Sequence, residues 1–187
     1  MQRIVVFGTS GSGKTTFAAS LSNRLAIPAI EIDSLHWGPN WTPASKQTLR
    51  DRLMHVTAGQ AWVIDGNYSA VRDIVWQRAD TLIWLDYPMS TTFVRVLCRT
   101  FRRWWTNEQL WAGNRERLSV QFFSRDSLFL WVVQTWRKHR RDYPRLLRSQ
   151  IQQGKQVLRF RTPADASHWL QSNASRNQTR EPVQCPE

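Results

Sequence analysis

Residues 8–15, Gly-Thr-Ser-Gly-Ser-Gly-Lys-Thr, constrain the fold of this chain more than any other stretch. They follow the apolar run 4–7 and lead into the helix-forming stretch 16–21. This spacing of glycines before Lys-Thr, between a strand and a helix, is typical of a loop that wraps phosphate groups. Glycines let the backbone curl so that amide N–H groups converge on phosphate oxygens, and the following helix adds the positive end of its dipole. A structural Gly/Ser-rich turn is the plainer alternative, and the Lys-Thr pair argues against it.

The loop therefore predicts a nucleoside triphosphate site, with ATP and Mg²⁺ as the expected ligands. We expect Lys14 to reach the β- and γ-phosphates and the Thr15 hydroxyl to bind Mg²⁺. The predicted nucleotide-binding residues are Gly8, Thr9, Ser10, Gly11, Ser12, Gly13, Lys14, Thr15 and Thr16.

Short apolar runs alternate with helical patterns along the rest of the chain. Because the runs are nearly all apolar, they predict a parallel sheet covered by helices on both faces. The expected fold is an α/β domain with a doubly wound, five-stranded parallel sheet, like that of P-loop NTPases and nucleotide kinases. The predicted strands are 1–7, 29–32, 61–64, 81–85 and 156–160. The predicted helices are 14–26, 42–58, a short one near 71–75, 90–105, one that starts at Ser124, and 163–170.

Particular residues mark the expected ends of these elements. Thr42 followed by Pro43 is typical of a helix N-terminus. The turn 137–141 is basic, as is common at a helix C-terminus, and Pro144 is expected to break or restart that helix. We expect one kinase-like domain over 1–170, with a lid-like insertion at about 106–124. Residues 171–187 are polar, and we expect a disordered tail there.

Composition limits the classes of protein that the chain can be. No run of about twenty apolar residues is present, so no membrane-spanning helix or membrane partner is expected. A strand begins at the N-terminus with no room for a signal peptide, and Cys98 and Cys185 stand apart without metal-ligand partners. These features predict a cytoplasmic protein with reduced thiols. The net charge is +12, and residues 95–161 hold 16 of the 26 Lys and Arg but only 4 of the 14 Asp and Glu.

Three predicted strands end in aspartate, at Asp33, Asp65 and Asp86. The carboxyl ends of parallel strands meet at one edge of the sheet, where ligands bind. We expect Asp86 to hold a Mg²⁺-bound water, as in Walker B sites. Asp33 could accept a proton from an acceptor hydroxyl or orient the metal, and Asp65 with Gly66 could hold the acceptor or the water shell of the metal. The alternative for each is an ordinary turn or cap residue.

Arginines form a second group of candidates. Arg95 and Arg99 share one face of a predicted helix, and guanidinium groups stabilise the charge of a transferring phosphoryl group. Arg115, beside a Gly-Asn turn, could swing in when the site closes. Arg72 could grip an acceptor phosphate in a bidentate manner. With Lys14 and Asp33, the residues Arg95, Arg99 and Arg115 make up the predicted catalytic set.

Aromatic residues gather after the second predicted strand. The faces of Trp37 and Trp41 could stack on an acceptor base or sugar, with His36 as a polar contact. Ordinary packing is the alternative. Four other tryptophans are expected in the core: Trp62, Trp84, Trp131 and Trp136.

Together these motifs resemble the adenylate-kinase-like branch of P-loop kinases. Residues 65–69, with Arg72 after them, are similar to the segment of that branch that contacts the acceptor nucleotide, although Asn67 and Tyr68 replace its aromatic-Pro pair. Arg95 and Arg99 resemble the arginine pair at the start of its lid, where one packs on adenine and the other reaches phosphate.

A closer resemblance is to bacterial proteins known as topology modulation proteins or adenylate-kinase-like ATPases. It covers about residues 1–170. The residues that carry it are Ile32-Asp33-Ser34-Leu35-His36-Trp37, Trp62-Val63-Ile64-Asp65-Gly66-Asn67-Tyr68-Ser69, Arg78-Ala79-Asp80 and Gly113-Asn114-Arg115-Glu116. The family name implies an influence on DNA topology.

Two functions follow as hypotheses. The first is a kinase that transfers the γ-phosphoryl group of ATP to a small-molecule or nucleotide acceptor, held by Asp33, His36, Trp37, Trp41, Asp65, Gly66, Asn67, Tyr68 and Arg72. The second is a nucleic-acid-associated ATPase or DNA-topology regulator that uses the basic segment 95–161. No DNA- or RNA-binding motif supports the second hypothesis, which depends on charge alone. A protein that only binds and slowly hydrolyses the nucleotide is a third, plainer possibility.

Overall fold

Five parallel strands form a single sheet in the order β2-β3-β1-β4-β5. The computed structural model describes residues 1–106, 108–114 and 128–178. The strands are β1 (Arg3–Gly8), β2 (Ala29–Glu31), β3 (Trp62–Asp65), β4 (Thr81–Leu85) and β5 (Gln156–Phe160). The strand β1 lies at the centre, with Val6 opposite Asp65 of β3 and Gly8 opposite Leu85 of β4. The predicted α/β fold with a five-stranded parallel sheet is confirmed.

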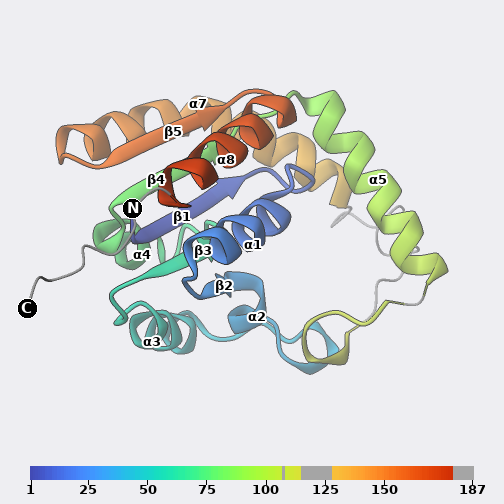
Figure 1. Ribbon diagram of the computed structural model, residues 1–187. Coiled ribbons are helices and arrows are strands. Elements are labelled where there is room, and N and C mark those ends of the chain that lie inside the picture. Colours follow the sequence, from blue (N-terminus) through green and yellow to red (C-terminus); the bar gives the residue numbers. More distant parts are fainter. Residues whose placement is uncertain (107, 115–127, 179–187) are drawn as a thin grey trace, which may run out of the picture.

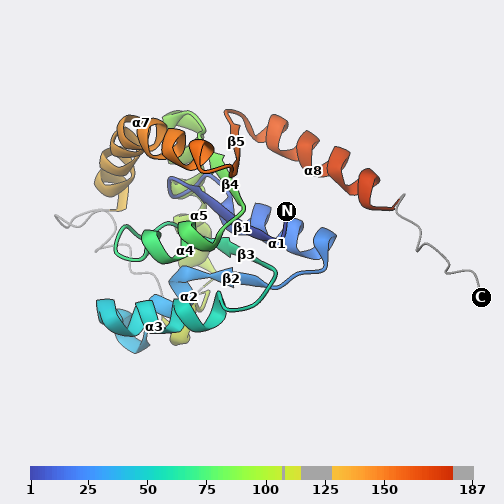
Figure 2. The same cartoon turned by 90° about the vertical axis from the view of Figure 1, so that its left-hand side faces the viewer.

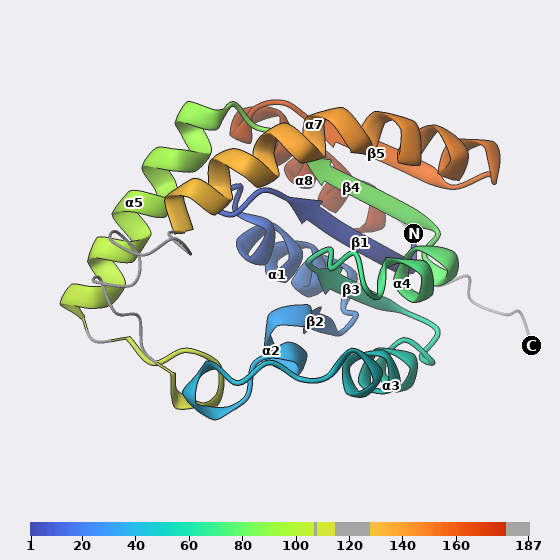
Figure 3. The same cartoon turned by 180° about the vertical axis from the view of Figure 1, so that it is seen from behind.

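Helices cover both faces of this sheet, because alternate strand residues are apolar on both sides (Figures 1 and 3). Ile4 and Val6 point to α1 (Lys14–Leu25) and α8 (Pro163–Gln178). Val5 and Phe7 point to the opposite layer. That layer consists of α3 (Lys46–Val56), α4 (Arg72–Arg78) and α7 (Leu128–Gln152). Trp62 and Trp84 are buried there, as expected for core tryptophans.

The remaining elements lie beyond the carboxyl ends of the strands. They are α2 (Ile32–His36), the 3₁₀ turns η1 (Pro39–Trp41) and η2 (Trp111–Gly113), and α5 (Met89–Trp105). Figure 2 shows α2 beside the end of β2, and in Figure 1 the chain after α5 returns past the sheet to reach α2. The loop between β1 and α1 is therefore surrounded by other segments, as a binding site requires.

Two predicted element boundaries are wrong. The strand β2 ends at Glu31, because Ile32 and Asp33 already belong to α2. The helix α3 begins at Lys46, and its cap is Ser45, whose Oγ accepts a hydrogen bond from Thr48 N at 3.0 Å. The predicted cap residues 42–43 instead shape the turn before the helix, where Pro43 pairs with Trp37 in an antiparallel bridge.

The prediction that Pro144 interrupts a helix is also wrong, because α7 runs through it from Leu128 to Gln152. Proline removes one helical hydrogen bond. The flanking Tyr143 and Leu147 are 1% and 5% exposed and pack against the sheet. This packing on both sides offsets the missing hydrogen bond. The predicted cap Ser124 and residues 115–124 of the predicted insertion lie outside the described residues.

The C-terminal helix is longer than expected. It continues through Gln178, so the disordered tail predicted from Gln171 is wrong for residues 171–178. Residues 179–187 lie outside the described part of the chain. Over the described residues, none of the helices combines the length and the apolar character needed to cross a bilayer.

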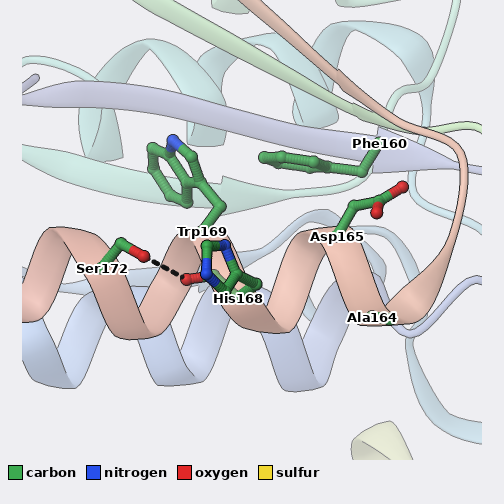
Figure 4. A pocket seen from close by; sticks show the side chains of 6 residues that line it. All are labelled: Phe160, Ala164, Asp165, His168, Trp169 and Ser172. Atoms are coloured by element: carbon green, nitrogen blue, oxygen red, sulfur yellow. Dashed lines mark hydrogen bonds between the residues drawn. The ribbon is translucent and has the colours of Figure 1, made fainter.

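A shallow pocket of about 510 Å³ lies where α8 packs beside Phe160, the last residue of β5 (Figure 4). Ser172 Oγ donates a hydrogen bond to the backbone oxygen of His168 at 2.9 Å. The rings of Phe160 and Trp169 lie 5.7 Å apart. None of the predicted site residues lines this pocket, which is formed by Phe160, Ala164, Asp165, His168, Trp169 and Ser172.

Candidate active site

The loop between β1 and α1 has the backbone that its glycines predict. Gly11 and Gly13 have φ angles of 80° and 83°, a conformation that L side chains rarely adopt. A Cβ on Gly8 would lie 2.6 Å from the Leu85 carbonyl oxygen, and a Cβ on Gly11 would lie 2.3 Å from that of Thr92. The loop is thus packed between β4 and α5, and only glycine fits at these two positions.

Lys14 and Thr15, at the start of α1, tie this loop to the neighbouring strand. Lys14 Nζ lies 3.5 Å from the Thr9 carbonyl oxygen, and Ser12 N donates to the same oxygen at 3.1 Å. The Thr15 hydroxyl donates a short hydrogen bond to Asp65 Oδ2 at the end of β3. The predicted Mg²⁺ ligand Thr15 therefore lies against Asp65.

The second oxygen of Asp65, Oδ1, is buried and has no hydrogen-bond partner among the described residues. Asp65 is only 8% exposed, and burial raises its pKa above the ordinary value. The charge of Lys14 and the hydrogen bond from Thr15 oppose this shift, and the carboxylates of Asp33 and Glu31 add to it. A buried carboxylate oxygen without a partner, beside a threonine hydroxyl, fits the oxygen ligands that Mg²⁺ prefers.

Asp86, the residue expected to hold a Mg²⁺-bound water, is bound elsewhere. It is 4% exposed and does not line the cavity described below. Arg140 Nε donates to its Oδ1 at 3.0 Å, and Arg159 Nε donates to its Oδ2 at 3.0 Å. Two guanidinium groups from α7 and β5 already neutralise this carboxylate, so its side chain is engaged away from the cavity although the end of β4 flanks the phosphate loop.

Asp33 lies at the start of α2 and accepts a hydrogen bond from the Tyr68 hydroxyl at 2.5 Å. Burial and the charge of Asp33 raise the pKa of Tyr68 well above its ordinary value, so its hydroxyl keeps its proton. The His36 ring lies 4.9 Å from the ring of Tyr68 and 4.6 Å from that of Trp37. Burial lowers the pKa of His36, which favours its neutral form. Of the predicted acceptor-binding residues, Asp33, Tyr68 and His36 are thus brought together.

Three tryptophans form what we call the indole cluster: Trp37, Trp41 and Trp111. The ring centroids of Trp37 and Trp41 are 5.6 Å apart, and those of Trp41 and Trp111 are 6.5 Å apart. Trp111 Nε1 donates to Glu31 Oε2 at 3.0 Å. Asn114 fixes η2 beside η1, because its Nδ2 donates to the Gly38 carbonyl oxygen at 2.8 Å and its Oδ1 accepts from Trp41 N at 3.0 Å.

The segment after β3 continues the site towards α7. Gly66 has a φ of 122°, and a Cβ there would lie 3.2 Å from the Ile32 side chain. Asn67 Nδ2 donates to the Tyr143 hydroxyl at 2.9 Å, and Arg72 Nε donates to Asn67 Oδ1 at 3.0 Å. The Arg72 guanidinium lies 5.6 Å from the ring centroid of Tyr143. Asn67 thus positions the arginine predicted to bind an acceptor phosphate.

Arginines of α5 face the phosphate loop from the other side. Arg99 Nη2 donates to Ser10 Oγ at 3.1 Å. Arg95 lies beside Gly13, where an added Cβ would be 3.6 Å from its Nη1, and its guanidinium is 5.8 Å from the ring centroid of Tyr87. Both predicted lid arginines therefore lie beside the phosphate loop. Arg115 lies outside the described residues.

A single cavity of about 1440 Å³ connects these parts. Along it lie the phosphate loop, the α5 arginines, Asp65, the Asp33–Tyr68 pair and the indole cluster. It is large enough for a nucleotide and a second small molecule. The predicted site residues that line it are Gly8, Ser10, Gly11, Ser12, Gly13, Lys14, Thr15, Thr16, Asp33, Trp37, Trp41, Asp65, Gly66, Asn67, Tyr68, Arg72, Arg95 and Arg99.

Several cavity residues were not predicted from the sequence. They are Glu31, Trp111, Lys138, His139 and Tyr143. His139 stacks on Tyr143 at 4.4 Å, and its pKa is lowered to about 4 by burial and by the nearby cations of Lys14 and Arg72. Lys138, His139, Asp142 and Tyr143 all line the cavity, and their helical spacing could have indicated that they share one face of a helix. The sequence pattern instead predicted the end of that helix at residues 137–141.

The basic residues of segment 95–161 lie in several different environments. Arg95, Arg99 and Lys138 line the cavity, and Arg140 and Arg159 neutralise Asp86. Other basic residues of α7 are exposed, namely Arg137, Arg141, Arg145 and Arg148. The nucleic-acid hypothesis, which depended on charge alone, is not supported.

Comparison with known proteins gives one relative by sequence. No protein-family profile matches the chain. The uncharacterized protein YqaC of Bacillus subtilis (strain 168) is 27% identical over 130 residues, which cover 68% of this chain and 72% of that protein. The narrower resemblance to topology modulation proteins finds no confirmation here and stays a prediction.

Solved structures of small-molecule kinases share the fold. The shikimate kinase of Bacteroides thetaiotaomicron aligns with a TM-score of 0.55 at 17% identity, over 95% of this chain and 98% of that one. The shikimate kinase of Acinetobacter baumannii in complex with shikimate aligns with a TM-score of 0.55 at 14% identity, over 97% and 96%. A gluconokinase of Sinorhizobium meliloti 1021 aligns at 0.52 and 17% identity, over 94% and 93%. At such identities the likeness is one of fold, and the chain has the fold of P-loop kinases.

Proposed function

We propose that this chain is an ATP-dependent phosphotransferase that transfers the γ-phosphoryl group to a hydroxyl of a small molecule. The observation that carries the proposal is the single cavity that joins the phosphate loop to the Asp33–Tyr68 pair. A protein that only bound a nucleotide would not need a second, carboxylate-bearing end to its cavity. The fold shared with small-molecule kinases agrees with this assignment.

The transfer needs a group that takes up the proton of the acceptor hydroxyl. The acceptor oxygen forms a bond to the γ-phosphorus while the bond from that phosphorus to the β–γ bridging oxygen breaks, which leaves ADP. Asp33 is the candidate base, because it lines the cavity and its Oδ1 is oriented by the Tyr68 hydroxyl. The proton released by the acceptor would pass to the Asp33 carboxylate.

The phosphate end of the cavity supplies the compensating positive charge. Lys14, Arg95 and Arg99 lie around the loop where the triphosphate would be held. Thr15 and Asp65 are the residues that would hold Mg²⁺, in place of Asp86. The cation, when bound, neutralises charge on the phosphates.

The test is an ADP-release assay with a panel of hydroxyl compounds that includes shikimate and gluconate, since kinases of these names share the fold. At least one acceptor is expected to raise ADP release above the rate with water alone. Lys14→Ala should abolish both rates. Asp33→Asn should lower the acceptor-dependent rate by at least about a hundredfold while nucleotide binding persists, since a general base contributes 10²–10⁴-fold.

A matched control is Asp51→Asn, which removes an exposed carboxylate on α3 that accepts a hydrogen bond from Gln47 Nε2. It should leave all rates unchanged. If no compound in a broad panel raises ADP release, or if Asp33→Asn keeps the full acceptor-dependent rate, the proposed function is wrong.

A further inference from the structure

The acceptor end of the cavity has two walls of opposite character. One wall is formed by β2, α2, η1 and η2 and carries Glu31, Asp33 and the indole cluster. The other wall is formed by α4 and α7 and carries Arg72, Lys138, His139 and the carboxylate Asp142. Arg102 and Arg103 of α5 also line the cavity, and both pair with Glu108. The distribution of charge between the walls indicates which chemical group each one receives.

The cations gather on the side of the phosphate loop. Lys14, Arg72 and Lys138 all act on His139, whose pKa they lower together with burial. These positive groups therefore surround one region, and that region includes the lysine that reaches the β- and γ-phosphates. The carboxylate of Asp142 on the same wall, together with a bound triphosphate, matches their charge, so these cations do not require an anionic acceptor.

The opposite wall combines carboxylates with aromatic rings. Asp33 and Glu31 both line the cavity, where Asp33 accepts a hydrogen bond from the Tyr68 hydroxyl and Glu31 accepts one from Trp111 Nε1. The rings of Trp37 and Trp41 meet at 81°, and those of Trp41 and Trp111 meet at 76°. These are edge-to-face contacts between the rings themselves, and all three indoles also line the cavity, where an indole ring can attract a cation.

Glu31 is the residue on this wall whose role needs a ligand. It is half-buried, and Trp111 Nε1, a neutral donor, binds its Oε2 at 3.0 Å. No hydrogen bond to its Oε1 is found among the described residues. The segment η2 does not need Glu31 as an anchor, because Asn114 already holds it to Gly38 and Trp41. A carboxylate that lines the cavity and has one neutral donor can pair with a cationic group of a ligand.

We infer that the acceptor carries a positively charged amine, held in the indole cluster and paired with Glu31, with its hydroxyl directed to Asp33. This inference depends on the proposed phosphotransferase function. It names the acceptor class as amino alcohols or amino sugars rather than hydroxy acids. The indole rings supply cation–π attraction, and the carboxylate supplies the counter-charge.

Calorimetric titration of the full chain, with ADP and Mg²⁺ present, tests the inference through matched probes. Choline is compared with its neutral isostere, in which a tert-butyl group replaces the trimethylammonium group. Glucosamine is compared with glucose and with glucuronate, which share its ring. Each ammonium compound is expected to bind at least about tenfold more tightly than its neutral partner, and glucuronate is expected to bind most weakly.

Glu31→Gln should remove most of this preference, because it keeps the hydrogen bond acceptor for Trp111 and loses the charge. Thermal unfolding of the variant checks that the fold is kept. Asp51→Asn, which removes a carboxylate outside the cavity, should preserve the preference. A second variant, Trp41→Leu, should weaken binding of the ammonium probes more than binding of glucose.

The inference is overturned if neither ammonium probe binds more tightly than its neutral partner, or if glucuronate binds most tightly of the ring compounds. Retention of the full preference in Glu31→Gln would also overturn it. These binding results are separate from turnover. A cation preference without phosphoryl transfer would contradict the proposed function alone, and transfer to an anionic acceptor would contradict the inference alone.

Discussion

At the scale of single residues, the environment decides what each strand-end carboxylate can do. Asp65 and Asp86 end the two strands that flank β1 and are both buried. Asp65 has one oxygen without a partner among the described residues and faces the cavity. Asp86 has both oxygens bound by guanidinium groups. The first is suited to a metal, and the second to holding α7 and β5 on the sheet.

Asp65→Asn tests how this carboxylate affects the stability of the metal-free protein and whether it contributes to binding of Mg-ATP. Because folding raises the pKa of Asp65 above its unfolded value of 3.8, the folded state binds the proton more tightly. Its contribution to stability is present at low pH and is lost as the pH rises from about 4 through the folded pKa. Metal-free wild type should therefore lose stability relative to the variant as the pH rises to neutrality, measured as the difference in Tm.

Addition of Mg²⁺ and ATP at neutral pH should reverse that order. The wild type should gain more stability than Asp65→Asn, and the variant should bind Mg-ATP at least about tenfold more weakly, as is usual when a group beside a metal is lost. Equal Mg-ATP affinity in the two proteins would contradict the assignment of Asp65 to the metal.

Asp86→Asn should act on stability instead. It leaves two guanidinium groups without their counter-charge, although Arg140 and Arg159 are 41% and 37% exposed and so keep some water. The expected loss is about 2 kcal/mol in the free energy of unfolding from urea titration, below the full cost of a buried unpaired charge. Asp73→Asn, which breaks an exposed pair with Arg50, should change the free energy of unfolding much less than Asp86→Asn does. A loss of Mg-ATP binding without a loss of stability in Asp86→Asn would contradict this role.

From the sequence we assigned the Mg²⁺-bound water to Asp86 and the acceptor to Asp65, and the arginine partners of Asp86 could not be predicted. They are Arg140 and Arg159, which lie 54 and 73 residues away from Asp86 along the chain. The phosphate loop, by contrast, was predicted residue by residue, because its whole geometry is contained in eight consecutive positions. Glu31 and Trp111 were missed because 80 residues separate them and neither belongs to a local motif.

At the scale of secondary-structure elements, the packing of the phosphate loop against α5 links nucleotide binding to helix position. Gly11 has a φ of 80°, and a Cβ there would lie 2.3 Å from the Thr92 carbonyl oxygen and 2.7 Å from the Val96 side chain. This close packing fixes the position of the phosphate loop relative to α5, the helix that carries Arg95 and Arg99.

Gly11→Ala should break this fit, and Gly154→Ala provides the matched control. Gly154 has a φ of 81° and nothing within 4 Å of an added Cβ, so its variant should pay only the backbone strain, about 1 kcal/mol. Gly11→Ala adds a clash with backbone and should cost about 3 kcal/mol or more, with loss of nucleotide binding. Equal losses of stability in urea titration would contradict the close packing of the loop on α5.

Element boundaries were harder to predict than element types. The helix α7 continues through Pro144 because Tyr143 and Leu147 pack in the core, which a local proline rule does not include. Residues 42–45 form a turn because two backbone hydrogen bonds hold them. Gly38 N donates to the Thr42 carbonyl oxygen, and Ala44 N donates to the His36 carbonyl oxygen. Both outcomes depend on contacts outside the local stretch.

At the scale of the whole molecule, the sheet order brings the parts of the site to one edge. The strand β1 lies between β3 and β4, so the phosphate loop is flanked by both strand ends, and β2 with α2 extends the site beyond β3 (Figure 3). The segment 108–114 crosses from the end of α5 to η1 and completes the aromatic wall. The parallel sheet was predictable from the apolar runs, but this crossing was not, because it depends on one buried asparagine.

The central claim is that the phosphate loop and the Asp33 pocket are two halves of one phosphotransferase. Mass spectrometry of a metabolite mixture incubated with the protein, ATP and Mg²⁺ tests it most directly. We expect a compound that gains one phosphoryl group in step with ADP formation, with the wild type and not with Lys14→Ala or Asp33→Asn. Release of ADP and inorganic phosphate in equal amounts, with no phosphorylated product, would contradict the claim.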